Sequence, residues 1–143
     1  APAGRGRLYQ IGGNFAHAAV CLGMCHLVYV CLPNVEIISE FTRAVTGWDV
    51  DTAELLTAGE RIANIRQAFN VREGLNPLEY AMPERLINRE PVKAGPLAGM
   101  VIDEELMIRE YLEAMDWDLK TAKPSRHKLE ELGLEDEARE LWP

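Results

Sequence analysis

The residues best suited to chemistry lie in one short segment, Val20-Cys21-Leu22-Gly23-Met24-Cys25. If the segment is helical, Cys21 and Cys25 lie one turn apart on the same face. Thiolate sulfur is the preferred protein ligand for the iron of iron–sulfur clusters. Gly23 has no side chain, so a backbone or a cofactor can approach it closely. Two cysteines are too few to close a four-sulfur site, so the spacing indicates part of an iron site at most.

Core packing is the competing interpretation of the cysteines. Free cysteine is among the most buried residue types and behaves as a small hydrophobe. On spacing alone, packing is favoured for Cys21, Cys25 and Cys31 alike. An odd number of cysteines clustered near one end is also unlike a disulfide framework. This pattern favours a reducing compartment, and a cytoplasmic location is expected.

Other polar residues offer weaker candidates. His17 and His26 flank the cysteine segment, and each could be a ligand or a proton carrier, although hydrogen-bonded core histidines are the favoured interpretation. His127 stands among charged residues and is expected to be solvated. Arg72 and Glu73 end an amphipathic stretch, where a local ion pair is favoured over a buried pair that supports a site.

The elements that position these residues are predicted to be helices. Gly12-Gly13 reads as a break and Asn14 as the N-cap of a first helix, which Pro33 ends. No formally charged residue occurs from Phe15 to Leu32, a length close to that of a membrane span. Gly23 and the histidines interrupt this stretch, so we expect no membrane segment. A helix that is apolar all round is then expected at the centre of a larger protein.

The rest of the chain also reads as helical. Apolar periodicity and end signals predict helices bounded by Ile37 and Gly47, begun by Asp51 and ended by Gly74, begun by Asp103, begun by Pro124-Ser125 and ended by Gly133, and from Glu135 to Leu141. Residues 75–101 hold four prolines and two glycines, which predict a long loop with one helical turn at 84–88. No strand pattern persists. The expected fold is all-α, with about five or six helices in a single domain covering residues 1–143.

Larger side chains are expected to fill or seal this core. Trp48, Trp117 and Trp142 stand near predicted helix ends, where an aromatic ring usually seals a core edge. The methionines are expected as core filler. The formal net charge is −8, and an acidic surface repels nucleic acid and anionic lipid. Both are therefore excluded as partners.

A series of short motifs resembles one known family. In chain order these are Gly23-Met24-Cys25, Phe41 to Trp48, Gly59-Glu60-Arg61-Ile62, Phe69-Asn70-Val71-Arg72-Glu73-Gly74, Met82 to Leu86, Gly95-Pro96, Trp117-Asp118 and Pro124 to Leu134. From about residue 14 to the end, their order and spacing resemble the C-terminal domain of the tungsten-containing aldehyde ferredoxin oxidoreductases. The ordered series carries the resemblance, and its most specific part is Phe-Asn-x-Arg-Glu-Gly after Gly-Glu-Arg-Ile.

The resemblance implies a cofactor-dependent redox enzyme. Family members hold tungsten, or molybdenum, between two pterin dithiolenes and oxidise an aldehyde with water to a carboxylic acid. Two electrons leave through a four-iron four-sulfur cluster to ferredoxin. By this resemblance Cys25 is the fourth cysteine ligand of the cluster, while Gly23 and Met24 belong to the turn that holds a pterin. The resemblance assigns no catalytic residue to this chain.

Two departures from the family pattern affect this expectation. The motif resembled begins with an aspartate that contacts the pterin, and Val20 stands in its place. Valine cannot accept hydrogen bonds, so that contact is lost or supplied elsewhere. The Cys-x-x-Cys-x-x-x-Cys motif that provides the other three cluster ligands does not occur in these 143 residues. We therefore expect this chain alone to bind no tungsten and to make no complete cluster.

Several alternatives stay open at this stage. A fragment of a longer enzyme would have the remaining parental domains, ferredoxin and the aldehyde as partners, and a homodimer is compatible with it. The substrate could instead be a sugar-phosphate aldehyde or an aryl thioester. From another class of protein, the chain could be a stand-alone helical interaction module that has lost the cofactor, as Val20 suggests.

Overall fold

The computed structural model describes residues 3–31, 34–80, 82–83, 87 and 90–143, and within them the chain is all-α as predicted. The helices are α1 (Arg5–Cys21), α2 (His26–Cys31), α3 (Val35–Thr46), α4 (Thr52–Arg72), the 3₁₀ helix η1 (Pro77–Glu79), α6 (Glu104–Met115), α7 (Arg126–Glu131) and α8 (Glu135–Leu141). The extended pairing found in these ranges is one isolated bridge between Trp117 and Pro124. No helix in the described part of the chain is long and apolar enough to cross a membrane.

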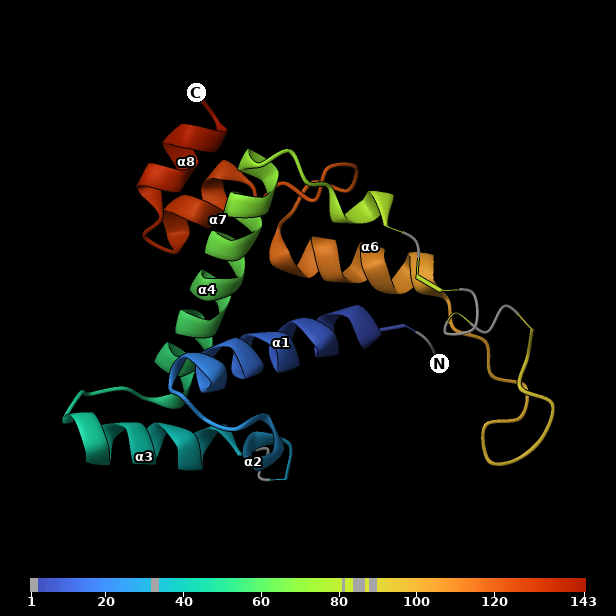
Figure 1. The fold of residues 1–143 in the computed structure, drawn as a ribbon, viewed down its shortest axis with the longest axis horizontal. Coiled ribbons are helices and arrows are strands. Elements are labelled where there is room, and N and C mark those ends of the chain that lie inside the picture. Colours follow the sequence, from blue (N-terminus) through green and yellow to red (C-terminus); the bar gives the residue numbers. More distant parts are fainter. Residues whose placement is uncertain (1–2, 32–33, 81, 84–86, 88–89) are drawn as a thin grey trace.

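Helix α1 is central to the arrangement, since it packs against both α4 and α6 (Figure 1). Two glycines allow these close crossings. A Cβ atom on Gly59 of α4 would lie 1.8 Å from the backbone oxygen of Asn14, and one on Gly6 of α1 would lie 2.5 Å from the backbone nitrogen of Tyr111. At both crossings the backbones approach too closely for any side chain, so only glycine fits.

The first turn of α1 is capped by a residue distant in sequence. Gly4 and Gly6 donate backbone N–H hydrogen bonds to Glu110 of α6, at 2.7 Å to Oε1 and 3.0 Å to Oε2. These bonds satisfy two donors that a helix N-terminus otherwise leaves without an intrahelical acceptor, and the carboxylate charge complements the helix dipole. They also lower the pKa of Glu110, the Gly4 bond contributing most.

Several predicted helix ends are confirmed. Asp51 begins α4 by accepting the Glu54 N–H at 2.8 Å, and Ser125 begins α7 by accepting the Lys128 N–H at 2.9 Å. Gly47 ends α3 in the left-handed region, with φ of 73°. Such helix ends can be predicted from the sequence because each end residue hydrogen-bonds to a residue only three or four positions away.

The prediction for the first helix is wrong in both its limits. Helix α1 begins at Arg5, runs through Gly12-Gly13 and ends at Cys21. Each helical glycine costs about 1 kcal/mol relative to alanine, but burial of Phe15 and its neighbours in the core outweighs that cost. Asn14 is buried inside the helix at the crossing with Gly59, so it caps nothing. Pro33 and the helical turn predicted at 84–88 lie outside the described residues, apart from Ile87.

Within the described residues, two hydrophobic clusters join α1, α3 and α4, and α4, α7 and α8. The first joins α1, α3 and α4 through Phe15, Ala18, Ala19, Ile38 and Leu55. The second, here named the closed cluster, joins the end of α4 to α7 and α8 through Ala68, Leu129, Leu132, Leu134, Ala138 and Leu141. The first cluster lies beside the end of α1 that leads to the cysteines, so it sets the position of that turn.

The large side chains fulfil their predicted roles in part. Trp117 is half-buried and donates its indole N–H to the buried Asn64 Oδ1 at 2.8 Å, and Trp142 donates to the Pro124 carbonyl at 3.0 Å. Trp48 is exposed, so the prediction that it seals a core edge is wrong. Met115 is fully buried, as core filler should be, whereas Met100 is exposed on the long loop.

Candidate functional site

The segment singled out from the sequence forms the end of α1 and the turn that follows. Gly23 adopts φ of 77°, its N–H donates to the Val20 carbonyl at 3.0 Å, and the Met24 N–H donates to the Ala19 carbonyl at 3.1 Å. This pair of bonds is the Schellman arrangement, in which a left-handed residue ends a helix and the next residue packs back on it. Met24 does pack against the first hydrophobic cluster. The chain then leaves α1 in a fixed direction, at Cys25.

The cysteines are exposed, which contradicts the packing interpretation. Cys21, Cys25 and Cys31 are all free and lie at the surface of the described structure. The helix ends at Cys21, so Cys21 and Cys25 do not share a helical face as they would on a continuous helix. The core at this end is completed by Ala18, Ala19 and Met24 instead, which leaves the thiols outside it.

The elements around this turn expose many large apolar side chains. We name as the open face the exposed large apolar residues at the end of α1, in the following turn, and in α2 and α3, namely Val20, Leu22, Leu27, Val28, Val30, Phe41 and Val45. Exposure reaches 61% for Phe41 and 85% for Val45. Large contiguous apolar surface is uncommon on proteins that act alone and marks interaction sites. Figure 1 shows α2 and α3 at the same end of the molecule as the C-terminus of α1.

Among the described residues, no three histidine, cysteine, aspartate or glutamate side chains come together as a metal site would require. Cys25 has the right donor atom for an iron–sulfur cluster and is accessible, so it fits the role of a single ligand. Gly23 also fits a turn that a cofactor could approach, because an added Cβ would meet no atom within 4 Å.

The histidines and the Arg72–Glu73 pair have mostly structural surroundings. His17 accepts a hydrogen bond at Nδ1 from Arg66 Nη1 at 3.3 Å, since arginine can only donate. Burial, and then the charge of Arg66, lower the pKa of His17, so the neutral ring is favoured. The side chain of His26 lies outside the described structure, and His127 is exposed as predicted. Arg72 and Glu73 form the predicted local ion pair, 3.1 Å apart and half exposed.

Sequence reasoning missed a separate cavity between α1, α4 and α6. Tyr9, Arg66 and Tyr111 line it, and they come from three helices far apart in the chain. Tyr111 was recognisable only as part of the apolar face of its helix. No local motif marks the cavity, because packing brings its residues together.

Fold and turn together define an all-helical domain with exposed thiols at and after the end of α1. Comparison with known proteins gives the family. The family model described as aldehyde ferredoxin oxidoreductase, domains 2 and 3, matches residues 1–134. This chain therefore belongs to the aldehyde ferredoxin oxidoreductase family.

Curated relatives agree with the family model. Tungsten-containing aldehyde ferredoxin oxidoreductase of Pyrococcus abyssi is 38% identical over 98 residues, which cover 68% of this chain and 16% of the relative. The enzyme of the same name from Pyrococcus horikoshii is 36% identical over 99 residues, with the same two shares. That of Thermococcus kodakarensis is 34% identical over 96 residues, which cover 66% of this chain and 16% of the relative. The chain thus aligns with about a sixth of each relative.

Proposed function

We propose that this chain is the C-terminal helical part of a tungsten-pterin, iron–sulfur oxidoreductase that oxidises aldehydes to carboxylic acids and passes the electrons to ferredoxin. The observation that carries this proposal is the exposed Cys25 thiol, presented by a rigid turn at the edge of the open face. The names of the relatives, all tungsten-containing aldehyde ferredoxin oxidoreductases, support the reaction class.

In this proposal, each residue of the turn has a physical role. Cys25, as a thiolate, ligates one iron of a four-iron four-sulfur cluster whose other ligands come from elsewhere in a longer parent. Gly23 and Met24 fix the backbone next to a pterin, Gly23 through its left-handed conformation and Met24 through its packing on the core. When bound, the tungsten-pterin centre and the cluster would supply the oxidation of aldehyde and water, with two electrons passed on to ferredoxin and two protons released.

The open face supports the proposal that this chain packs against other domains of a longer parent. Apolar side chains on α2 and α3, the helices that follow the turn, lie exposed in this chain. In a longer parent, neighbouring domains would cover them and exclude water from the cluster. Exclusion of water and hydrogen bonding around the sulfurs set the potential of such clusters.

The sharpest test is Cys25→Ser in a longer parent that carries the other three ligands, with Cys21→Ser as the matched control. Both thiols are exposed and four residues apart, so general effects of losing a surface thiol are shared. We expect Cys25→Ser to lose or weaken the cluster signal in electron paramagnetic resonance and to lower the iron content, while Cys21→Ser keeps both. A native cluster signal and full electron transfer in Cys25→Ser would remove the ligand assignment.

The isolated 143-residue chain gives a complementary measurement. Because it offers a single well-placed thiol, we expect metal analysis to find neither tungsten nor a complete cluster in it. Stoichiometric iron or tungsten in the purified chain would contradict this view of an incomplete site.

A stand-alone helical interaction module is the second candidate, and Val20 is the observation in its favour. Val20 is 57% exposed at the position of the family's pterin-binding aspartate, so it offers an apolar contact where a cofactor needs an acceptor. The coding sequence before Ala1 discriminates between the two. A Cys-x-x-Cys-x-x-x-Cys motif there supports the enzyme, and a start codon close by supports the module.

A further inference from the structure

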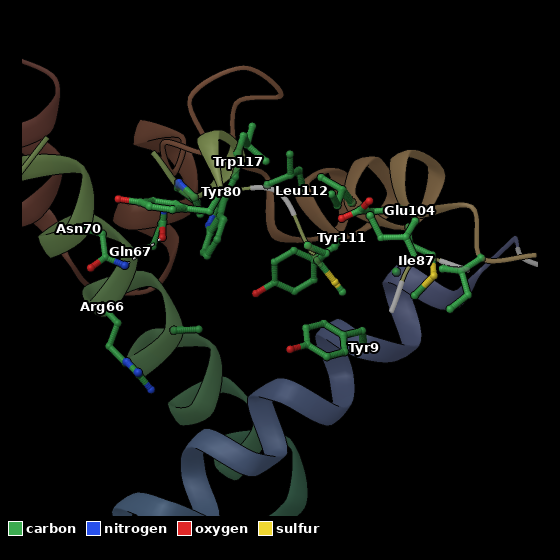
Figure 2. Close-up of a pocket in the computed structure, with 18 of the residues that line it drawn as sticks. Tyr9, Arg66, Gln67, Asn70, Tyr80, Ile87, Glu104, Tyr111, Leu112 and Trp117 are labelled. Carbon is green, nitrogen blue, oxygen red and sulfur yellow. Dashed lines mark hydrogen bonds between the residues drawn. The ribbon is translucent and has the colours of Figure 1, made fainter. Parts of the chain in front are cut away.

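A cavity of about 580 Å³ lies between α1, α4 and α6 (Figure 2). Pro77, Leu78 and Tyr80, from the segment after α4, also line it. Its lining is mostly apolar and aromatic. The volume is within the range of about 300–1,000 Å³ that is typical of small-molecule sites. The cavity is thus large enough for a ring with one or two substituents.

Its aromatic wall is continuous. The rings of Tyr9 and Tyr111 meet edge to face with centroids 5.5 Å apart, and those of Tyr111 and Trp117 meet likewise at 5.6 Å. Aromatic side chains arranged in this way offer ring faces and edges to a flat apolar ligand. The wall therefore favours an aromatic body over a flexible polar one.

The same wall carries hydrogen-bond donors aimed in one direction. Figure 2 shows the hydroxyl groups of Tyr9 and Tyr111 pointing toward α4, the helix that carries Arg66, Gln67 and Asn70. Neither hydroxyl hydrogen-bonds to another residue in the described ranges. Burial raises the pKa of Tyr111 to about 12, so this hydroxyl keeps its proton and can donate at neutral pH.

Arg66 adds a positive charge to the opposite wall. Its hydrogen-bond partner is His17, whose neutral form is favoured, and it takes part in none of the ion pairs found within the described structure. The side chain of Arg66 is exposed at the mouth of the cavity, so its other N–H donors face solvent and remain available to a ligand. Figure 2 places Glu104, the acidic residue of the lining, at the far end of the view from Arg66.

We propose that this cavity binds a small aromatic monocarboxylate, with its ring against Tyr9 and Tyr111 and its carboxylate toward Arg66. A planar guanidinium pairs with a carboxylate through two parallel hydrogen bonds, which a single ammonium cannot do. Glu104 disfavours a second negative charge on the same ligand. The site is distinct from the proposed metal ligand, because Cys25 lies beyond the end of α1 and is not among the residues that line the cavity.

Isothermal titration of the 143-residue chain with benzoate tests the proposal. We expect saturable binding with one site, weakened at least about tenfold by Arg66→Gln, since a charge-assisted hydrogen bond is lost. The matched control is Arg109→Gln, which removes an exposed arginine of α6 that lies outside the cavity lining. Absence of saturable benzoate binding, or equal affinities in the wild type and Arg66→Gln, would overturn the proposal.

Two further comparisons separate the carboxylate from the ring. Benzamide keeps the ring and lacks the charge, so we expect it to bind at least about tenfold more weakly than benzoate and to be insensitive to Arg66→Gln. Tyr111→Phe keeps the aromatic wall and removes one hydroxyl, and we expect it to weaken benzoate by roughly three- to tenfold. Equal binding of benzamide and benzoate would overturn the carboxylate assignment. Circular dichroism spectra and melting temperatures of the variants confirm that each remains folded.

Discussion

The closed cluster and the open face are built from the same kinds of side chain and differ in what covers them. Leu129 of the closed cluster is fully buried between α4, α7 and α8, and the nearby Trp142 indole is hydrogen-bonded as well as packed. Phe41 and Val45 of the open face recur at helical spacing on α3 and remain exposed. Amphipathic periodicity therefore predicts which face of a helix is apolar, but it does not predict what packs against that face. Stability should therefore depend on the closed cluster, while the open face remains available for contact.

The largest expected effect comes from truncating one buried residue of the closed cluster and one exposed residue of the open face. Leu129→Ala should lower the free energy of unfolding by about 2–5 kcal/mol, because it removes buried methyl groups and leaves a cavity. Phe41→Ala deletes a larger apolar side chain from the open face, yet the expected change is within about 0.5 kcal/mol. Urea denaturation followed by circular dichroism measures both. Similar losses for the two variants would mean that α3 is covered in solution and that the open face is misassigned.

A second experiment tests the helix crossing that supports both regions. Gly59→Ala places a methyl group against the backbone of Asn14, where neither backbone can yield locally, so we expect a loss of about 3 kcal/mol. Gly12→Ala is the matched control, because it lies in α1 with no atom within 4 Å of an added Cβ. Its greater helix propensity should raise stability by about 0.5–1 kcal/mol. The comparison uses midpoints of urea unfolding, and a harmless Gly59→Ala would mean that the two helices cross farther apart.

The smallest effect concerns the cap on α1, and pH reveals it. Hydrogen bonds from Gly4 and Gly6 lower the pKa of Glu110 in the folded state, so its contribution is present above the unfolded pKa, near 4.5, and is lost as pH falls through the folded value. Glu110→Gln should therefore lower the melting temperature at pH 7, and the difference from wild type should shrink in acid. Glu113→Gln, at an exposed position on the same helix, is the matched control for the loss of a carboxylate from α6. If the two variants differed from the wild type by the same melting temperature at every pH, the proposed cap would be wrong.

The features predicted correctly from the sequence are those with local causes. Asp51 and Gly47 set helix ends through bonds to residues within four positions, so their roles can be read one segment at a time. The Gly12-Gly13 pair was misread because its local preference for a break is overridden by packing against α4. Gly59 stood in the most specific family motif, but its reason, a backbone contact with a residue 45 positions earlier, requires the fold.

The candidate site divides in the same way. The resemblance drew attention to Gly23 and Cys25, and the structure supplies the reason for the glycine in a left-handed helix end. The exposure of Cys25 could not be predicted, because it depends on which other side chains complete the core. The cavity around Arg66 and Tyr111 was missed for the same reason, since its walls meet only when three helices pack.

The close approach of α1 to both of its neighbours has a consequence for the order of maturation. Because backbone meets backbone at Gly6 and at Gly59, α1 can neither slide nor rotate without a steric clash. Residues of α6, about a hundred positions after the start of α1, thus help to determine where the chain places Cys25. Under the proposed role of that thiol, inorganic sulfur and iron would be inserted after this helical domain has folded.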